Sequence, residues 1–111
     1  MAQPRDEPFS VTVDTTESGA LIEARGELDL ATADALASAI ATAAHGGTTT
    51  LDLSGIRFLD STGLRMLLVN ARTFGDALSI IPSPAVTRTI EIAGVTDRLP
   101  IDQDWPRSTG S

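Results

Sequence analysis

The sequence predicts a small α/β sandwich, with a mixed, mainly parallel sheet of about four to five strands and three or more helices. Three observations predict this fold class. The chain has 111 residues, 41% of them hydrophobic, which suits one compact core. Two strand-like segments precede the first helical pattern, and helical and strand-like segments then alternate to the end of the chain. Such strand-helix-strand units call for right-handed crossovers and parallel pairing.

Two segments near the start of the chain predict a β-hairpin. Residues 9–13, FSVTV, alternate apolar and polar side chains, and residues 20–26, ALIEARG, are reached through the turn-like letters TESG. A helix follows, because its apolar residues recur at helical spacing: Ala33, Leu36, Ala37, Ile40 and Ala44. The glycines Gly46 and Gly47 supply its C-terminal stop.

A second strand-helix pair occupies the middle of the chain. Residues 48–53, TTTLDL, predict a strand that ends at Ser54 and Gly55. The polar cluster in FLDSTGL, residues 58–64, then begins a helix that stops near Phe74. Its apolar residues follow the i, i+3, i+4, i+7 pattern: Leu64, Leu67, Leu68 and Ala71.

The last strand-helix pair is short and clearly bounded. Residues 77–81, ALSII, predict a strand. Ser83 is placed to cap the next helix, with Pro84 as its first residue. This helix is expected to run to about Ala93 and to stop at Gly94.

We therefore expect one domain over residues 9–101, a flexible N-terminus over residues 1–8, and a mobile tail over residues 102–111. The tail has no hydrophobic period, although Trp105 could fold back onto the body. No apolar run is long enough for a signal peptide or a membrane span, so a cytoplasmic protein without membrane insertion is the simplest expectation.

The charge and the missing cysteines exclude several kinds of partner and site. The net charge is −7, and the eight basic residues are scattered arginines, so direct nucleic-acid binding is not expected. A chain without cysteine has no disulfide and no thiolate metal site. We expect no cofactor and no bound metal.

Two polar loops are expected to meet at one edge of the sheet. Glu27 and Asp29 follow the second strand, while Asp60, Ser61 and Thr62 precede the second helix. In α/β sheets, functional groups gather beyond the carboxyl ends of the strands, where helix N-termini point outward. The same side chains also suit a purely structural role. Asp60 and Ser61 could cap the second helix, and Asp29 and Thr32 could cap the first helix.

No catalytic residue is expected. A serine hydrolase needs a base near its nucleophile, but the single histidine, His45, is predicted at the far end of the first helix. The stretch around Ser61 is not a G-x-S-x-G elbow. Phosphate-binding loops and phosphoacceptor receiver domains require a lysine, and this chain has none.

Three motifs together resemble the STAS domain of the anti-sigma factor antagonist family. They are GELDLATADAL (26–36), LDLSGIRFLDSTGL (51–64) and PSPAVTRTIEIAGV (82–95), and the resemblance covers residues 9–101. It implies that Ser61 is phosphorylated by a partner anti-sigma factor with serine kinase activity, and that Asp29 lies nearby on the partner-facing surface. The unphosphorylated protein would bind this partner and free a sigma factor, and a serine phosphatase would reset Ser61.

The resemblance also implies a partner-binding surface and leaves alternatives open. The expected surface lies on the two loops and the start of the second helix, and it comprises Glu27, Asp29, Thr32, Phe58, Asp60, Ser61, Thr62, Gly63 and Leu64. Some relatives carry threonine at the acceptor position, but Ser61 is favoured over Thr62 because it follows Asp60 directly. The alternative function is a STAS adaptor subunit of a lipid-transport ATPase complex or of a stress-sensing scaffold.

Overall fold

The structure is a computed structural model that describes residues 8–43 and 47–102 of the chain. Several predictions fall outside these residues. They concern the flexible N-terminus up to residue 7, the end of the first helix with His45, and the tail from residue 103 with Trp105.

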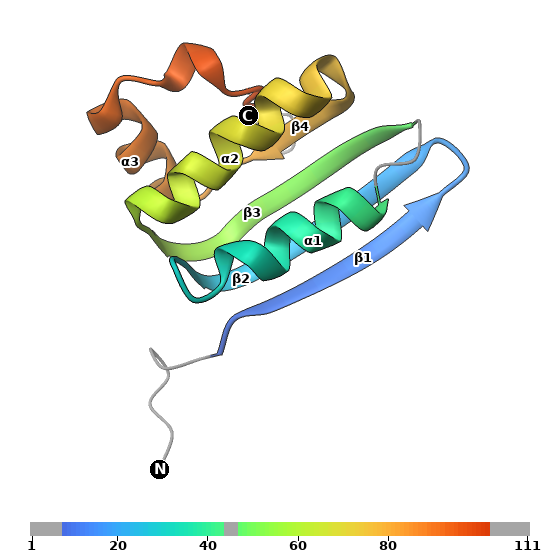
Figure 1. The fold of residues 1–111 in the computed structure, drawn as a ribbon, viewed down its shortest axis with the longest axis horizontal. Helices are drawn as coiled ribbons and strands as arrows, with labels where there is room; N and C mark the ends of the chain where they lie inside the picture. The colour runs from blue at the N-terminus through green and yellow to red at the C-terminus, as the bar shows by residue number, and fades with distance from the viewer. Residues whose placement is uncertain (1–7, 44–46, 103–111) are drawn as a thin grey trace, which may run out of the picture.

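A four-stranded mixed sheet forms the centre of the fold (Figure 1). Its strands are β1 (Ser10–Thr16), β2 (Gly19–Leu28), β3 (Thr48–Leu59) and β4 (Leu78–Ile81), and they lie in the order β1-β2-β3-β4. The predicted hairpin is confirmed, because β1 pairs with β2 in antiparallel register. Both of the other ladders are parallel, so the sheet is mainly parallel as predicted.

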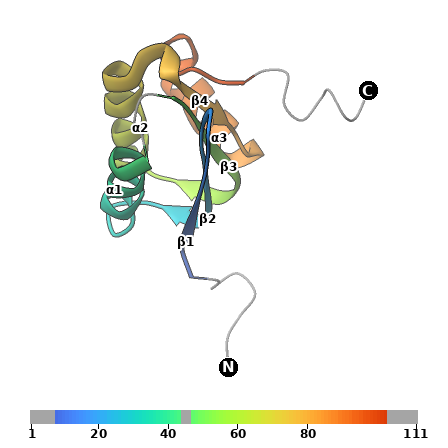
Figure 2. The same cartoon turned by 90° about the vertical axis from the view of Figure 1, so that its right-hand side faces the viewer.

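The helices cover the sheet from both sides (Figure 2). They are α1 (Ala33–Ala43), α2 (Ser61–Phe74) and α3 (Pro84–Ala93), with short 3₁₀ turns η2 (Gly75–Ala77) and η3 (Thr96–Arg98). Helices α1 and α2 lie side by side on one face of the sheet, and α3 packs on the other face against β3. The fold class is therefore the predicted α/β sandwich.

The core lies mainly between the sheet and the α1/α2 pair. Strand β2 shows the alternation that this arrangement requires, because Ile22 and Leu28 are fully buried while Glu23 and Glu27 are exposed. Helix α1 buries Leu36 and Ile40 against this face, and α2 buries Leu67 and Ala71. Burying a large aliphatic side chain stabilises the fold by about 1.5–3 kcal/mol.

The end of β3 differs from the prediction. The sequence pattern placed it at Ser54 and Gly55, but the strand continues to Leu59. The β2–β3 register skips a residue of β3 between Glu23 and Arg25, and again between Gly26 and Glu27. The turn-forming residues therefore form a β-bulge inside the strand, where the Asp52 carboxylate accepts a hydrogen bond from the Ser54 N–H at 2.9 Å.

The outer edge of β4 is covered by the segment that follows η3. Ile80 and Ile101 form an isolated parallel bridge. The Ile80 N–H donates to the Pro100 carbonyl at 2.9 Å, and the Asp102 N–H donates to the Ile80 carbonyl at 2.8 Å. This segment satisfies backbone groups that an open edge strand would leave unpaired.

Candidate functional site

The predicted meeting of two loops is present at the carboxyl ends of β2 and β3. These strands are parallel, and their last paired residues are Leu28 and Leu59. The Asp60 N–H continues this pairing by donating to the Leu28 carbonyl at 3.1 Å. The β2–α1 loop and the start of α2 therefore lie next to each other.

The Asp60 carboxylate joins the two loops. Its Oδ1 accepts a hydrogen bond from the Gly63 N–H at 2.8 Å, which makes Asp60 the N-cap of α2. Its Oδ2 accepts a second bond from the Leu30 N–H at 3.2 Å, across the gap to the other loop. Of the two residues expected to cap this helix, Asp60 does so, and Ser61 is the first helical residue.

Gly63 allows the first turn of α2 to approach β2 closely. A Cβ atom at this position would lie 2.5 Å from the Leu28 carbonyl oxygen and 2.8 Å from a methyl carbon of Leu59. Such contacts are too short for any side chain, so only glycine fits unless the backbone shifts. The local sequence thus fixes where α2 begins and how Ser61 is presented.

The β2–α1 loop is held by its own side chains. The Thr32 hydroxyl donates to the Glu27 carbonyl at 2.8 Å and accepts from the Asp29 N–H at 2.9 Å. The Asp29 carboxylate accepts from the Ala31 N–H at 3.0 Å. These bonds close the loop before α1 begins at Ala33, so the expected capping of α1 by Asp29 and Thr32 is replaced by a side-chain-closed turn.

Ser61 is the exposed hydroxyl of this site. It is the first residue of α2, and its side chain forms no hydrogen bond within the part of the chain that the structure describes. The neighbouring Thr62 is half-buried. The remaining predicted surface residues of α2 face inward: Gly63 is buried, and Leu64 packs against the core.

Two exposed apolar side chains flank the polar loops. Phe58, which was included in the predicted surface, is 48% exposed near the end of β3. Leu30 is 77% exposed and was missed from the predicted surface, although an apolar residue directly after Asp29 in a polar loop was a usable signal.

Glu27, another residue of the predicted surface, is exposed, and its carboxylate lies 3.9 Å from the Arg57 guanidinium. The site thus combines carboxylates, a hydroxyl and solvent-exposed apolar surface.

Within residues 8–43 and 47–102, no three acidic or histidine side chains lie together as metal ligands. None of the helices described is both long and apolar enough to cross a bilayer. The N–H groups at the start of α2 can stabilise a negative charge placed on Ser61.

Comparisons with known proteins agree with this fold. The family model described as "Mlab, STAS domain" matches residues 11–101. The anti-sigma-F factor antagonist RsfB of Mycobacterium tuberculosis is 34% identical over an alignment of 87 residues, and the match covers 73% of this chain and 71% of that protein.

Solved structures show the same architecture. An anti-sigma factor antagonist from Mycobacterium paratuberculosis superposes with a TM-score of 0.77 at 25% identity, covering 99% of this chain and 97% of the other. The anti-sigma factor antagonist SpoIIAA, in its unphosphorylated form, superposes with a TM-score of 0.63 at 21% identity, covering 92% and 98%.

The mixed sheet, the two helices on one face and the loop pair at the carboxyl ends of β2 and β3 define a STAS domain. The chain belongs to the STAS domain, anti-sigma factor antagonist family.

Proposed function

We propose that this protein is an anti-sigma factor antagonist whose binding is switched by phosphorylation of Ser61. Its unphosphorylated form binds an anti-sigma factor with serine kinase activity and thereby frees a sigma factor. The observation that carries the proposal is the placement of Ser61, an exposed hydroxyl at the first position of α2 beside the Asp60 cap. The antagonist names of the relative RsfB and of the Mycobacterium paratuberculosis protein support the same function.

The start of α2 can accept a phosphate without unfolding. Phosphorylation adds a charge of roughly −1.5 to −2 near neutral pH. At a helix N-terminus this charge meets free N–H groups and the positive end of the helix dipole, which stabilises it by about 0.3–2 kcal/mol. The fold is therefore expected to survive the modification.

Phosphorylation is expected to weaken the complex with the partner and not the fold. At an interface built around a neutral hydroxyl, a phosphate brings steric bulk, a desolvation cost, and repulsion wherever the partner presents a carboxylate. A loss of about 3 kcal/mol weakens binding roughly a hundredfold. This is enough to release a partner without any change of fold.

The partner-binding surface follows from the same loops. We place it on Glu27, Asp29 and Thr32 of the β2–α1 loop, on Phe58, and on the start of α2, where Asp60, Ser61 and Thr62 lie and where Gly63 and Leu64 hold the helix in place. Leu30 joins this surface because of its exposure. Exposed apolar and aromatic side chains beside polar groups are typical of interface centres.

The protein acts as a cytoplasmic binding module and not as an enzyme in this proposal. Ser61 is the substrate side chain of the partner kinase, and a serine phosphatase returns it to the unmodified form. In this proposal, no residue of the site has a catalytic role.

The test is affinity capture from lysate of the source cells with wild-type, Ser61→Asp and Ser61→Ala baits, followed by titration of the purified partner. We expect a kinase-type anti-sigma factor to bind wild type and Ser61→Ala, and to bind Ser61→Asp about a hundredfold more weakly. With ATP, wild type and the control Thr62→Val should gain one phosphate, and Ser61→Ala should gain none.

Two results would contradict the proposal. One is an affinity for Ser61→Asp within twofold of wild type. The other is a transport ATPase or a scaffold protein retained equally by all three baits with Ser61 unmodified, which would instead identify a constitutive STAS adaptor.

A further inference from the structure

A second surface lies along the outer side of α2 and begins at Arg65, one turn after Ser61. It is a shallow hollow of about 480 Å³ between α2 and η3. Its lining combines three arginines with apolar side chains, and the residues used below are Arg65, Leu68, Val69, Arg72 and Arg98. We refer to these five residues as the arginine hollow.

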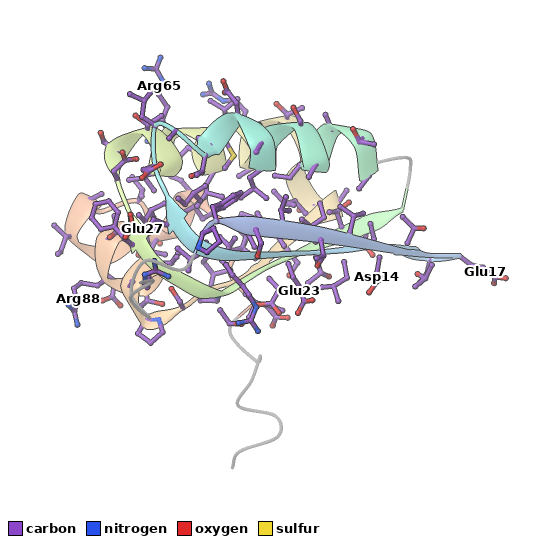
Figure 3. All side chains as sticks on the ribbon, turned by 90° about the horizontal axis from the view of Figure 1, so that it is seen from below. Asp14, Glu17, Glu23, Glu27, Arg65 and Arg88 are labelled. Atoms are coloured by element: carbon purple, nitrogen blue, oxygen red, sulfur yellow. The ribbon has the colours of Figure 1, made fainter. Side chains whose placement is uncertain are left out.

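The arginine hollow concentrates positive charge on an acidic protein. Three of the eight basic residues of the chain line it, although the net charge is −7. Within the described residues, Arg65, Arg72 and Arg98 form no ion pair with a carboxylate. Figure 3 shows Arg65 projecting from the side of the sheet that α1 and α2 cover, while Asp14 and Glu23 lie on the opposite side.

Two apolar side chains of the arginine hollow reach the solvent. Val69 is 55% exposed, and Leu68 beside it is only half-buried. An apolar centre flanked by arginines resembles the composition of protein interfaces, where arginine is enriched and can pair with carboxylates through two hydrogen bonds. A partner bound here would bury apolar side chains against Leu68 and Val69 and could pair its carboxylates with the arginines.

The spacing of the charges matches a helix. Arg65 and Arg72 are seven residues apart on α2, which is two turns or about 10 Å along the axis. Val69 lies between them on the same face of α2. This pattern is typical of a helix–helix interface, in which apolar side chains pack at the centre and charged side chains lie at the rim. Carboxylates one heptad apart on a second helix would face these two arginines.

We propose that the arginine hollow is a docking surface for an acidic amphipathic helix of a partner protein. The helix places an apolar side chain against Leu68 and Val69, and its carboxylates pair with Arg65, Arg72 and Arg98. A second copy of this chain fits less well, since none of the three described helices carries two carboxylates: α1 has only Asp34, α2 has none and α3 has only Glu91. Ser61 does not line the hollow, although Arg65 lies one turn after it on α2. The proposal does not depend on the proposed switch.

The chain offers an unusually clean test because it contains no lysine. Each of the variants Arg65→Lys, Arg72→Lys and Arg98→Lys keeps the charge and introduces the only lysine side chain of the protein. A carbodiimide joins a lysine amine directly to a carboxylate in contact with it. The matched control is Arg88→Lys, because Arg88 is exposed on α3, on the other face of the sheet.

Full-length variants are added to lysate of the source cells, cross-linked, and mapped by mass spectrometry. The expected result is a link from positions 65 and 72 to Asp or Glu residues of one partner, seven positions apart in a helical segment, with no such link from position 88. With the purified partner, Arg72→Glu should weaken binding about tenfold, Arg88→Glu should leave it within twofold, and a Glu→Arg change at the linked residue should restore binding to Arg72→Glu.

Three results would overturn the proposal. The first is that links from positions 65 and 72 go mainly to carboxylates of the same chain, which would mean that the chain covers the hollow itself. The second is a link between two copies of this chain. The third is a yield of links from positions 65, 72 and 98 no higher than from position 88. Circular dichroism of each variant must match wild type, so that loss of binding reports the surface and not the fold.

Discussion

The carboxylate of Asp60 accepts a hydrogen bond from the backbone N–H of Leu30, at 3.2 Å and thirty positions earlier in the chain. The same carboxylate caps α2 through Gly63. One side chain therefore sets both the start of the helix that carries Ser61 and the position of the exposed Leu30 beside it. Changes at Asp60 should affect stability and partner binding together.

Two substitutions at Asp60 distinguish the contributions of its two hydrogen bonds. Asp60→Ala removes both and should lower the free energy of unfolding by about 1–2 kcal/mol. Asp60→Asn keeps a good cap, but its amide NH₂ would face the Leu30 N–H, so it should cost less than alanine while loosening the β2–α1 loop. Urea unfolding and amide hydrogen exchange at Leu30 measure the two effects. The exposed Asp76 gives the control Asp76→Ala, and equal losses at both positions would contradict the argument.

Alanine substitutions at Gly63 and at Gly55 should differ in how strongly they destabilise the protein. Gly63→Ala should destabilise the protein by about 1–3 kcal/mol, because the new Cβ would press on the backbone carbonyl oxygen of Leu28. Gly55→Ala should cost clearly less, since the nearest atom to its Cβ is the Cγ of the flexible Arg25 side chain, at 2.8 Å. Thermal unfolding of both variants tests the contrast. Similar melting temperatures would show that α2 can shift away from β2.

Two helix-start serines should differ in their contribution to stability. Ser83 is 3% exposed, and its hydroxyl accepts a hydrogen bond from the Val86 N–H at 3.1 Å as the cap of α3. Ser83→Ala should therefore lower the free energy of unfolding by about 1–2 kcal/mol. Ser61→Ala should change it by less than about 0.5 kcal/mol, as expected for an exposed side chain without such a bond. A large loss for Ser61→Ala in urea would mean that this hydroxyl has a structural role.

A negative charge at position 61 should stabilise the isolated protein. Ser61 and Arg65 are exposed and one turn apart on α2. In Ser61→Glu, the new carboxylate meets the helix dipole and the Arg65 guanidinium, which together contribute about 0.5–1.5 kcal/mol at low salt. The melting temperature should rise, and the rise should shrink in high salt and in the double variant with Arg65→Gln. A salt-independent change would point to another cause.

The sequence was sufficient to predict those helices and strands whose ends are set by neighbouring residues. Helix α3 begins and ends as predicted, because Ser83, Pro84 and Gly94 act through neighbouring backbone groups. The extension of β3 through Ser54 and Gly55 was not predictable in this way. The same residues make a turn or a bulge depending on whether β2 lies alongside, and that pairing is a tertiary contact.

The meeting of the two loops at one edge of the sheet was predictable, but the contacts between them were less so. The order of strands and helices brings Asp29 and Asp60 to the same edge of the sheet. Nothing local indicates, however, that the Asp60 carboxylate reaches Leu30 or that Thr32 closes its own loop. The arginine hollow was also hidden, because Arg98 joins Arg65 and Arg72 only through the path of the chain after α3.

The order of strands across the sheet repeats their order along the chain, and the segment 100–102 closes the last edge. Each strand therefore pairs with the strand made just before it, but both parallel ladders join residues about thirty positions apart, so their closure is expected to be slower than that of the β1–β2 hairpin. During synthesis the N-terminal parts emerge first, so each new strand meets a neighbour already in place. The Ser61 loop pair is complete once α2 has emerged, before β4 and the edge segment that covers it have been added.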